Sequence, residues 1–224
     1  MTIYERAMEF IADGDAVGLG SGRASAEFIK LLGARVKSGL HVRCVATSRS
    51  SDQLAASVGI PLVPLEEAMP LSLAVDGADE VAPNLDLIKG LGRALVREKI
   101  VASAARKVVI LVGPGKEVPV LGAKGKLPVE VVPFALPLAR RRLLDLGCVP
   151  VPDEQDGRLF VSDNGNHIID CGIQPLHDPK AMETTIRAIP GVVGTGLFLG
   201  MAHVVLFGDE SFNLLKEKQR TTDP

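Results

Sequence analysis

The first polar cluster that could do chemistry is a glycine-rich loop after the first apolar run of the chain. The loop reads Ser21, Gly22, Arg23, Ala24, Ser25 and precedes a helical pattern. Loops of this kind can aim backbone N–H groups and a helix N-terminus at an anion, and the Ser21 and Arg23 side chains would add donors. The loop therefore favours a phosphate site, with a tight turn that binds no ligand as the alternative.

A dinucleotide is the main rival ligand for this loop. Dinucleotide sites use an acidic residue at the end of the second strand, about 20 residues further on, to bind the ribose hydroxyls. Here the second strand is expected to end near Thr47 and Ser48, where neither Asp nor Glu occurs. We therefore favour a phosphate over NAD.

Carboxylates are concentrated directly after the apolar run at residues 71–75, in the segment Asp76, Gly77, Ala78, Asp79, Glu80. Parallel sheets deliver the residues at the carboxyl ends of their strands into a ligand crevice. Close carboxylates repel, so one of them can hold a proton and act as an acid. The alternative is a solvated acidic turn in which Asp79 caps a helix.

Two lysines lie in glycine-rich turns. Lys89 begins the turn Lys-Gly-Leu-Gly-Arg in front of a predicted helix, and Lys116 ends the turn Val-Gly-Pro-Gly-Lys after a predicted strand. A lysine before a helix N-terminus can stabilise an oxyanion. A surface position in a plain turn fits either lysine equally well.

Glu98 lies on the apolar face of a helix predicted over residues 92–106. At about 100° per residue it falls among small apolar residues that include Ala94, Val101 and Ala102. Desolvation raises the pKa of a carboxyl group, which suits a general base. The alternative is a glutamate at the edge of the apolar face that pairs with a lysine.

Alternating strands and helices must position these clusters. Residues 1–124 alternate apolar runs with helical patterns, which predicts an α/β fold with a Rossmann-like parallel sheet and helices on both faces. Residues 125–199 mix strands and helices and predict an inserted smaller α+β domain. The apolar run at 201–208 is expected to return to the first sheet, so residues 200–224 join residues 1–124 in one domain. The polar tail from Lys216 is expected to fray.

Composition narrows the functional classes. Hydrophobic residues make up 46% of the 224, the net charge is −2 and aromatic residues are only 4%, so we expect no nucleic-acid partner. No run approaches the ~20 apolar residues of a membrane span. The three cysteines form no CxxC motif, which indicates a reduced, cytoplasmic compartment. The four histidines lack the spacing of a zinc site, so we expect no metal, and we expect no other cofactor.

The polar motifs occur in the order found in the type A ribose-5-phosphate isomerase family, which the chain resembles from about residue 18 to residue 208. The segments that carry the resemblance are residues 76–80, 84–90, 97–102, 127–131, 162–166, 189–193 and 196–198. The resemblance implies a two-part fold and a cofactor-free interconversion of D-ribose 5-phosphate and D-ribulose 5-phosphate through a cis-enediolate. It also implies a place in the non-oxidative pentose phosphate pathway and a homodimer or homotetramer.

The resemblance also implies roles for single residues. Glu98 would be the general base, Asp76 would assist ring opening with Asp79 nearby, and Lys89 would stabilise the enediolate. The positions that match the family's substrate-binding residues are Ser21, Gly22, Arg23, Ala24, Asp76, Gly77, Ala78, Asp79, Lys89, Gly90, Leu91, Gly92 and Lys116.

The chain departs from the family pattern in its loops. Many members have Thr-Gly-Ser-Thr where this chain has residues 21–24, so Arg23 would bind phosphate bidentately and Ser25 would replace a lost hydroxyl. The turn after Lys89 carries Leu91 and Arg93 in place of small residues. Gly113 and Gly115 replace an Asp and a Ser. These changes affect the residues that are expected to bind phosphate. They leave unchanged the residues that are expected to move protons or stabilise charge, namely Asp76, Asp79, Lys89 and Glu98.

Two other functional classes use related folds. A non-catalytic sugar-phosphate sensor of a repressor would be expected to carry a DNA-binding module, and residues 1–15 are too few for one. An amino-sugar-phosphate deaminase or a lactonase would be expected to use a histidine in the crevice. His167, beside Asn166, is the nearest histidine to any motif and is expected to be structural.

Overall fold

The structure is a computed structural model that describes residues 1–220, and the chain divides into two compact units. The first unit comprises Met1–Ala78, Arg97–Lys116 and the chain from Gly200 onward; the second comprises Asp79–Val96 and Glu117–Leu199. Residues 79–96 and 117–124, which we predicted to lie in the larger domain, thus group with the second unit. That each part is a separate domain stays a prediction.

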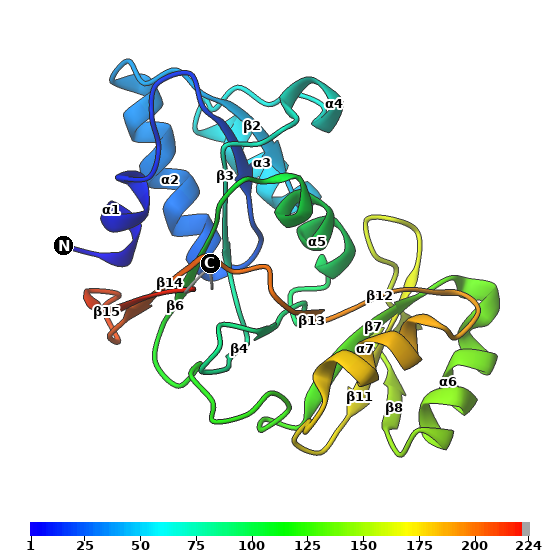
Figure 1. The fold of residues 1–224 in the computed structure, drawn as a ribbon. Coiled ribbons are helices and arrows are strands. Elements are labelled where there is room, and N and C mark those ends of the chain that lie inside the picture. Colours follow the sequence, from blue (N-terminus) through cyan, green and yellow to red (C-terminus); the bar gives the residue numbers. More distant parts are fainter. Residues whose placement is uncertain (221–224) are drawn as a thin grey trace. The chain divides into compact units, whose positions relative to one another are not determined.

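A six-stranded sheet with the order β15-β14-β6-β3-β1-β2 forms the centre of the first unit (Figure 1). Five of its strands are parallel, namely β1 (Ala16–Leu19), β2 (Arg43–Ala46), β3 (Leu73–Gly77), β6 (Val108–Val112) and β14 (Val204–Gly208). The chain leaves β1 towards β2 and later returns to β3 on the other side of β1. Such a reversal of strand order opens a crevice at the carboxyl ends of β1 and β3.

Helices cover both faces of this sheet, as the sequence predicts. Because side chains alternate along a strand, Val17 and Leu19 face the core that they share with α2 (Arg23–Lys37), while Gly18 faces the opposite side. On that side α5 (Leu95–Ala104) packs so closely that a Cβ at Gly18 would lie 2.4 Å from Val101 Cγ1. The helices α1 (Ile3–Met8) and α3 (Arg49–Ser57) contribute Ile3, Ala7 and Ala55 to the α2 side.

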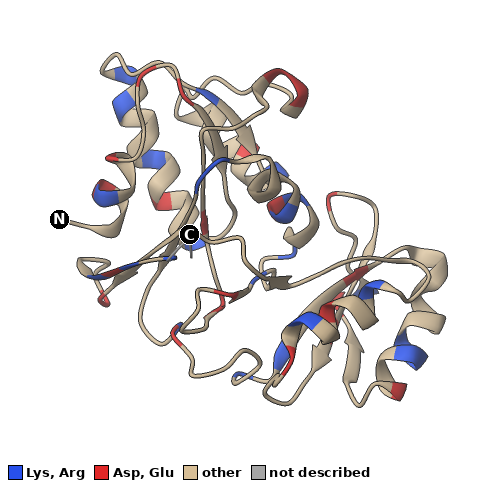
Figure 2. Ribbon diagram, viewed as in Figure 1, with Lys and Arg blue, Asp and Glu red and all other residues tan. Residues whose placement is uncertain are grey.

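The second unit is built on an antiparallel sheet with the order β12-β7-β11-β8, which confirms the predicted α+β mixture. Its strands are β7 (Lys126–Val131), β8 (Val149–Pro152), β11 (His167–Gly172) and β12 (Val192–Thr195). Its core contains Leu143 of α6 (Leu136–Asp145) and Ile186 of α7 (Pro179–Arg187), packed with Val129 and Ile169 of the sheet. Both helices also carry charged residues (Figure 2).

Several short elements complete the fold. The strands β4 (Glu80–Val81), β5 (Leu87–Ile88) and β13 (Leu197–Phe198) form a small sheet in the second unit. A hairpin joins β9 (Glu154–Gln155) to β10 (Arg158–Leu159), α4 (Leu65–Ala68) precedes β3, and η1 (Pro133–Ala135) precedes α6. Two predicted site residues flank the small sheet, because β4 follows Asp79 and β5 leads directly into Lys89.

Two predicted elements are wrong in detail. The helix predicted over residues 92–106 begins at Leu95, because Arg93 has a left-handed φ of 68°. The tail predicted to fray instead forms β15 (Leu214–Gln219), because β14 offers it an antiparallel edge; residues 221–224 of that tail lie outside the described residues.

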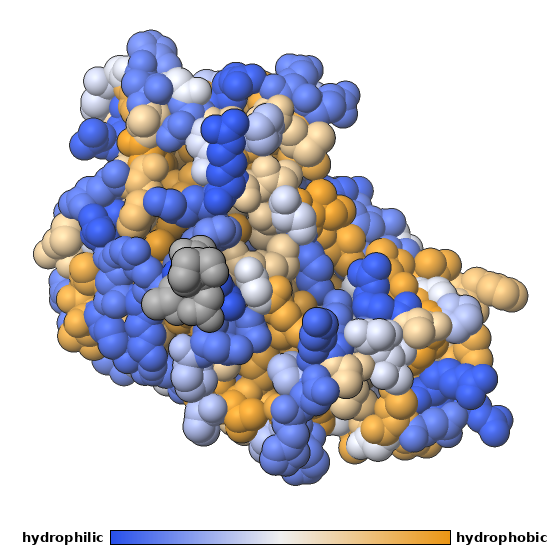
Figure 3. Space-filling view, in the orientation of Figure 1, coloured by the Kyte–Doolittle hydropathy of each residue, from blue (hydrophilic) through white to orange (hydrophobic). Residues whose placement is uncertain are grey.

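The described residues contain no helix that is long and apolar enough to cross a membrane. Hydrophobic and hydrophilic residues are mixed over the face in view in Figure 3. The strongly exposed apolar side chains include Phe134 (97% exposed), Val149 (63%) and Val151 (57%), all of which belong to the second unit.

Candidate active site

Hydroxyl groups cluster at the carboxyl ends of β1 and β2. Ser21 Oγ lies 2.8 Å from Thr47 Oγ1 and donates to Ser48 Oγ at 2.7 Å. Ser51 Oγ donates to the Gly20 carbonyl at 2.7 Å, which ties α3 to the β1 loop. The sequence predicts that the second strand ends near Thr47 and Ser48, as it does, but we missed Ser51, whose only signal is its place one turn into the helix after β2.

Asp76, at the end of β3, is held by the neighbouring β1 loop. Its Oδ1 accepts hydrogen bonds from the Ser21 N–H (3.1 Å), the Ser25 hydroxyl (3.1 Å) and the Gly77 N–H (2.7 Å). Ser25 is fully buried and Asp76 is 6% exposed. Three donors on one oxygen fix the orientation of this carboxylate. The structure thus brings together the predicted residues Ser21, Ser25, Asp76 and Gly77.

The close approach of the two strands depends on Gly20. A Cβ at this position would lie 2.1 Å from Asp76 Oδ1 and 2.6 Å from Asp76 Cα. We expect Gly20→Ala to lower the free energy of unfolding by about 1–3 kcal/mol, because the β3 backbone must shift to make room. Urea denaturation measures this change. Gly92→Ala is the control, since a Cβ there meets nothing within 4 Å. Equal urea midpoints for the two variants would contradict the close approach of Gly20 to Asp76.

Glu98 is buried, with 4% of its surface exposed. It lies one helical turn before Val101, the residue that packs on Gly18, so its side chain faces the sheet. A crossover helix runs antiparallel to the strands that it connects, so Glu98 lies closer than Val101 to the carboxyl ends of β1 and β3. The structure therefore supports the predicted apolar face and contradicts a glutamate at the solvent edge.

Other predicted residues of the first unit lie in the β1 loop and in the turn after β6. Gly22 has a φ of 90° and is the N-cap residue of α2. Among the described residues, no side chain makes a capping hydrogen bond at this end of the helix. Arg23 is exposed, and its guanidinium lies 5.3 Å from the centre of the Phe212 ring. Ala24 is partly buried. Lys116 is partly buried in the turn after β6.

The second unit holds the other predicted residues. Lys89 is 3% exposed, and its Nζ lies 5.3 Å from the centre of the Phe198 ring. Asp79 Oδ2 accepts the Leu91 N–H at 3.1 Å, so this carboxylate is bound to the turn formed by Gly90, Leu91 and Gly92. Glu80 is buried and accepts the Gly122 and Lys124 N–H groups, at 2.6 and 2.8 Å, which is a structural role.

The histidines make other contacts. His167 Nδ1 lies 2.8 Å from the Phe160 carbonyl, and His203 Nδ1 accepts the Val108 N–H at 3.0 Å. Burial lowers the pKa of His203, which suits a neutral acceptor. His41 lies beside Asp13. The contacts of His167 and His203 with backbone groups are structural and disfavour a histidine-dependent deaminase or lactonase.

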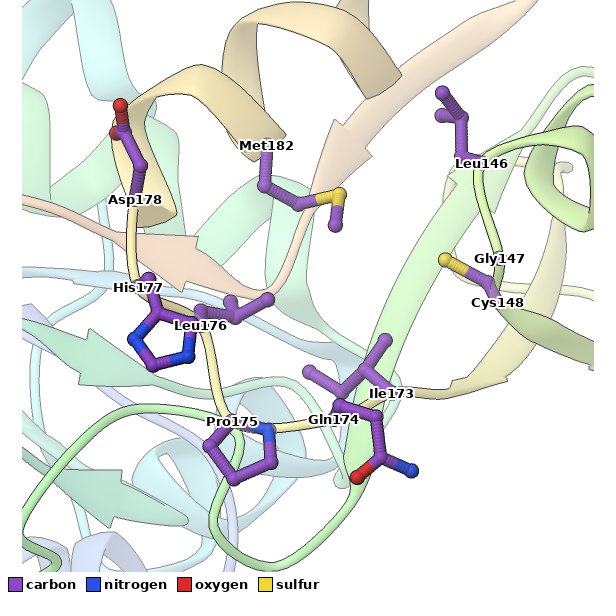
Figure 4. A pocket seen from close by; sticks show the side chains of 10 residues that line it. All are labelled: Leu146, Gly147, Cys148, Ile173, Gln174, Pro175, Leu176, His177, Asp178 and Met182. Atoms are coloured by element: carbon purple, nitrogen blue, oxygen red, sulfur yellow. The ribbon is translucent and has the colours of Figure 1, made fainter.

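A cavity of about 300 Å³ in the second unit contains the fourth histidine, His177 (Figure 4). The residues that line it are Leu146, Gly147, Cys148, Ile173, Gln174, Pro175, Leu176, His177, Asp178 and Met182. It shares no residue with the predicted site, so we assign the site from the converging polar groups rather than from the cavity. Within residues 1–220, no group of three or more His, Cys, Asp and Glu side chains could hold a metal ion.

The fold and the first-unit cluster are typical of an α/β enzyme with a ligand site at the carboxyl ends of parallel strands. The family model for ribose 5-phosphate isomerase A (phosphoriboisomerase A) matches residues 43–211. Over 205 residues the chain is 46% identical to the ribose-5-phosphate isomerase A of Roseiflexus castenholzii. This alignment covers 90% of this chain and 88% of the relative.

Solved structures agree with this match. Ribose 5-phosphate isomerase A from Methanocaldococcus jannaschii has a TM-score of 0.91 and 37% identity, and 97% of this chain and 96% of that chain are covered. A D-ribose-5-phosphate isomerase in complex with phospho-erythronic acid has a TM-score of 0.92 at the same identity and coverage. The chain belongs to the ribose 5-phosphate isomerase A family and is an isomerase.

Proposed function

We propose that this chain interconverts D-ribose 5-phosphate and D-ribulose 5-phosphate, with Glu98 as the general base. The observation that carries the proposal is the burial of Glu98 on the helix that packs on β1, in the same unit as the anchored carboxylate of Asp76. A desolvated carboxylate is a stronger base than a solvated one, which suits removal of a proton from carbon.

The reaction needs one proton to move between adjacent carbons. Glu98 takes the proton from C2 of the open-chain aldose and returns it to C1, so C2 is oxidised while C1 is reduced and no electrons leave the sugar. Asp76 assists ring opening and moves protons between the sugar oxygens, and Asp79 follows it in the chain as a second carboxylate. Lys89 stabilises the negative charge of the cis-enediolate.

The phosphate group of the substrate suits the β1 loop. The N-terminus of α2 and the hydroxyls of Ser21, Thr47 and Ser48 are donors of the type that phosphate oxygens prefer. Arg23 and Lys116 would add positive charge once Arg23 leaves the Phe212 ring. The remaining residues that we propose for substrate contact are Gly22, Ala24, Ser25, Gly77, Ala78, Gly90, Leu91 and Gly92.

The decisive assay follows ribulose 5-phosphate formed from ribose 5-phosphate by the purified chain in excess EDTA. We expect turnover to survive the chelator, because protein groups perform every proposed step. Phospho-erythronic acid, which a related isomerase binds, should raise the KM and leave kcat unchanged. Activity that disappears in EDTA and returns with a divalent cation would refute the proposal.

We also propose a homodimer or homotetramer located in the cytoplasm. The exposed apolar side chains of the second unit, such as Phe134 and Val149, support self-association. Three buried free thiols suit a reducing compartment, and burial raises the pKa of Cys44 to about 12, which keeps it unreactive.

A further inference from the structure

The turn that follows Lys89 has an unusual backbone. Arg93 has a φ of 68°, in the left-handed region that side chains other than glycine rarely adopt, and its N–H donates to the Gly90 carbonyl at 2.9 Å. A conformation of this kind costs free energy and persists only where its surroundings hold it. The turn should therefore have a specific anchor.

The side chain of Arg93 provides that anchor. Its Nη1 donates to Asp170 Oδ1 at 2.7 Å, and its Nη2 donates to Asp170 Oδ2 and to Asp153 Oδ1, both at 2.9 Å. The side chains of Arg93, Asp153 and Asp170 are only 16%, 13% and 13% exposed. A planar guanidinium held by two carboxylates has one position and one orientation.

The sheet of the second unit fixes both carboxylates. Asp170 lies on β11 and also pairs with Lys126 of β7 at 2.7 Å, and the Asp153 N–H donates to the Ile168 carbonyl at 2.8 Å. At its start the turn is held by the Lys89 N–H, which donates to the Gly196 carbonyl at 2.9 Å. The turn that carries Lys89 is thus held at its start by the segment that follows β12 and at its end by Asp170 of β11 and by Asp153, which follows β8.

We propose that Arg93 is a positioning residue that holds the Lys89 turn in its reactive arrangement through Asp170 and Asp153. The inference rests on the proposed function, in which Lys89 stabilises the enediolate. It also gives a reason for Arg93, one of this chain's departures from the family pattern. Loss of the guanidinium lets the turn relax and displaces the Lys89 ammonium, and displacements near 1 Å cost up to about 10²-fold in rate.

The test is a double-mutant cycle between Arg93→Ala and Lys89→Met, with kcat and KM for ribose 5-phosphate measured for each protein. With Lys89 present, we expect Arg93→Ala to lower kcat by about 10-fold or more and to change KM far less. In the Lys89→Met background, Arg93→Ala should change kcat by no more than about 2-fold. Arg141→Ala, which removes an exposed arginine of the same unit, is the control.

Equal kcat losses in the two backgrounds would overturn the inference, because Arg93 would then act independently of Lys89. The inference would also be overturned if the parent chain is active and Arg93→Ala has the same kcat as the parent. Should Arg93→Ala not fold, Arg93→Lys decides the same question, since lysine keeps the charge but cannot make the bidentate pair. A parent chain without isomerase activity would instead refute the proposed function.

Discussion

Replacing Glu98 by glutamine lowers kcat for ribose 5-phosphate by at least about 10²-fold, the usual loss when a general base is removed. Glutamine has nearly the same shape but cannot accept the C2 proton. The folded state survives, because the neutral amide suits a site that is only 4% exposed. Steady-state kinetics gives the loss, and a urea titration shows that the fold is intact.

Isotope exchange sharpens this prediction. In D₂O the parent chain should introduce deuterium at the reacting carbons, and Glu98→Gln should lose exchange and turnover in the same proportion. Glu27→Gln, at an exposed position of α2, is the matched control and should behave like the parent. Near-normal turnover in Glu98→Gln would mean that another group is the base.

Replacing Lys89 by methionine lowers kcat by about 10²–10³-fold, the loss expected when one stabilising group of a developing oxyanion is removed. Methionine keeps the length and the apolar stem, so the packing against Phe198 and the 3% exposed site are preserved. KM should change much less than kcat, because the charge that Lys89 stabilises develops only after binding.

The control for Lys89 is Lys30→Met, which removes an exposed lysine that pairs with Glu27 on α2. We expect its kinetics to match those of the parent. Thermal melting of both variants separates a catalytic loss from a folding defect. If Lys89→Met raised KM and left kcat unchanged, Lys89 would contribute to substrate binding and not to the enediolate.

Local patterns in the sequence predicted the central elements of the fold and the burial of single residues. The apolar run at residues 16–19 is β1 as predicted, and the helical period alone placed Glu98 on the apolar face of its helix. Both results depend on neighbours within one turn or one strand, where periodicity is informative. The order of the motifs then indicated the family that the comparisons show.

Contacts between distant segments were decided only by the tertiary structure. Ser21 and Ser25 reach Asp76 Oδ1 because β1 and β3 are adjacent. The carboxylates that hold Arg93 lie 60 and 77 residues further along the chain. A strand's own residues specify that it is buried but not which strand will lie beside it. For that reason Asp153 and Asp170 carry no sequence signal of the roles that the fold gives them.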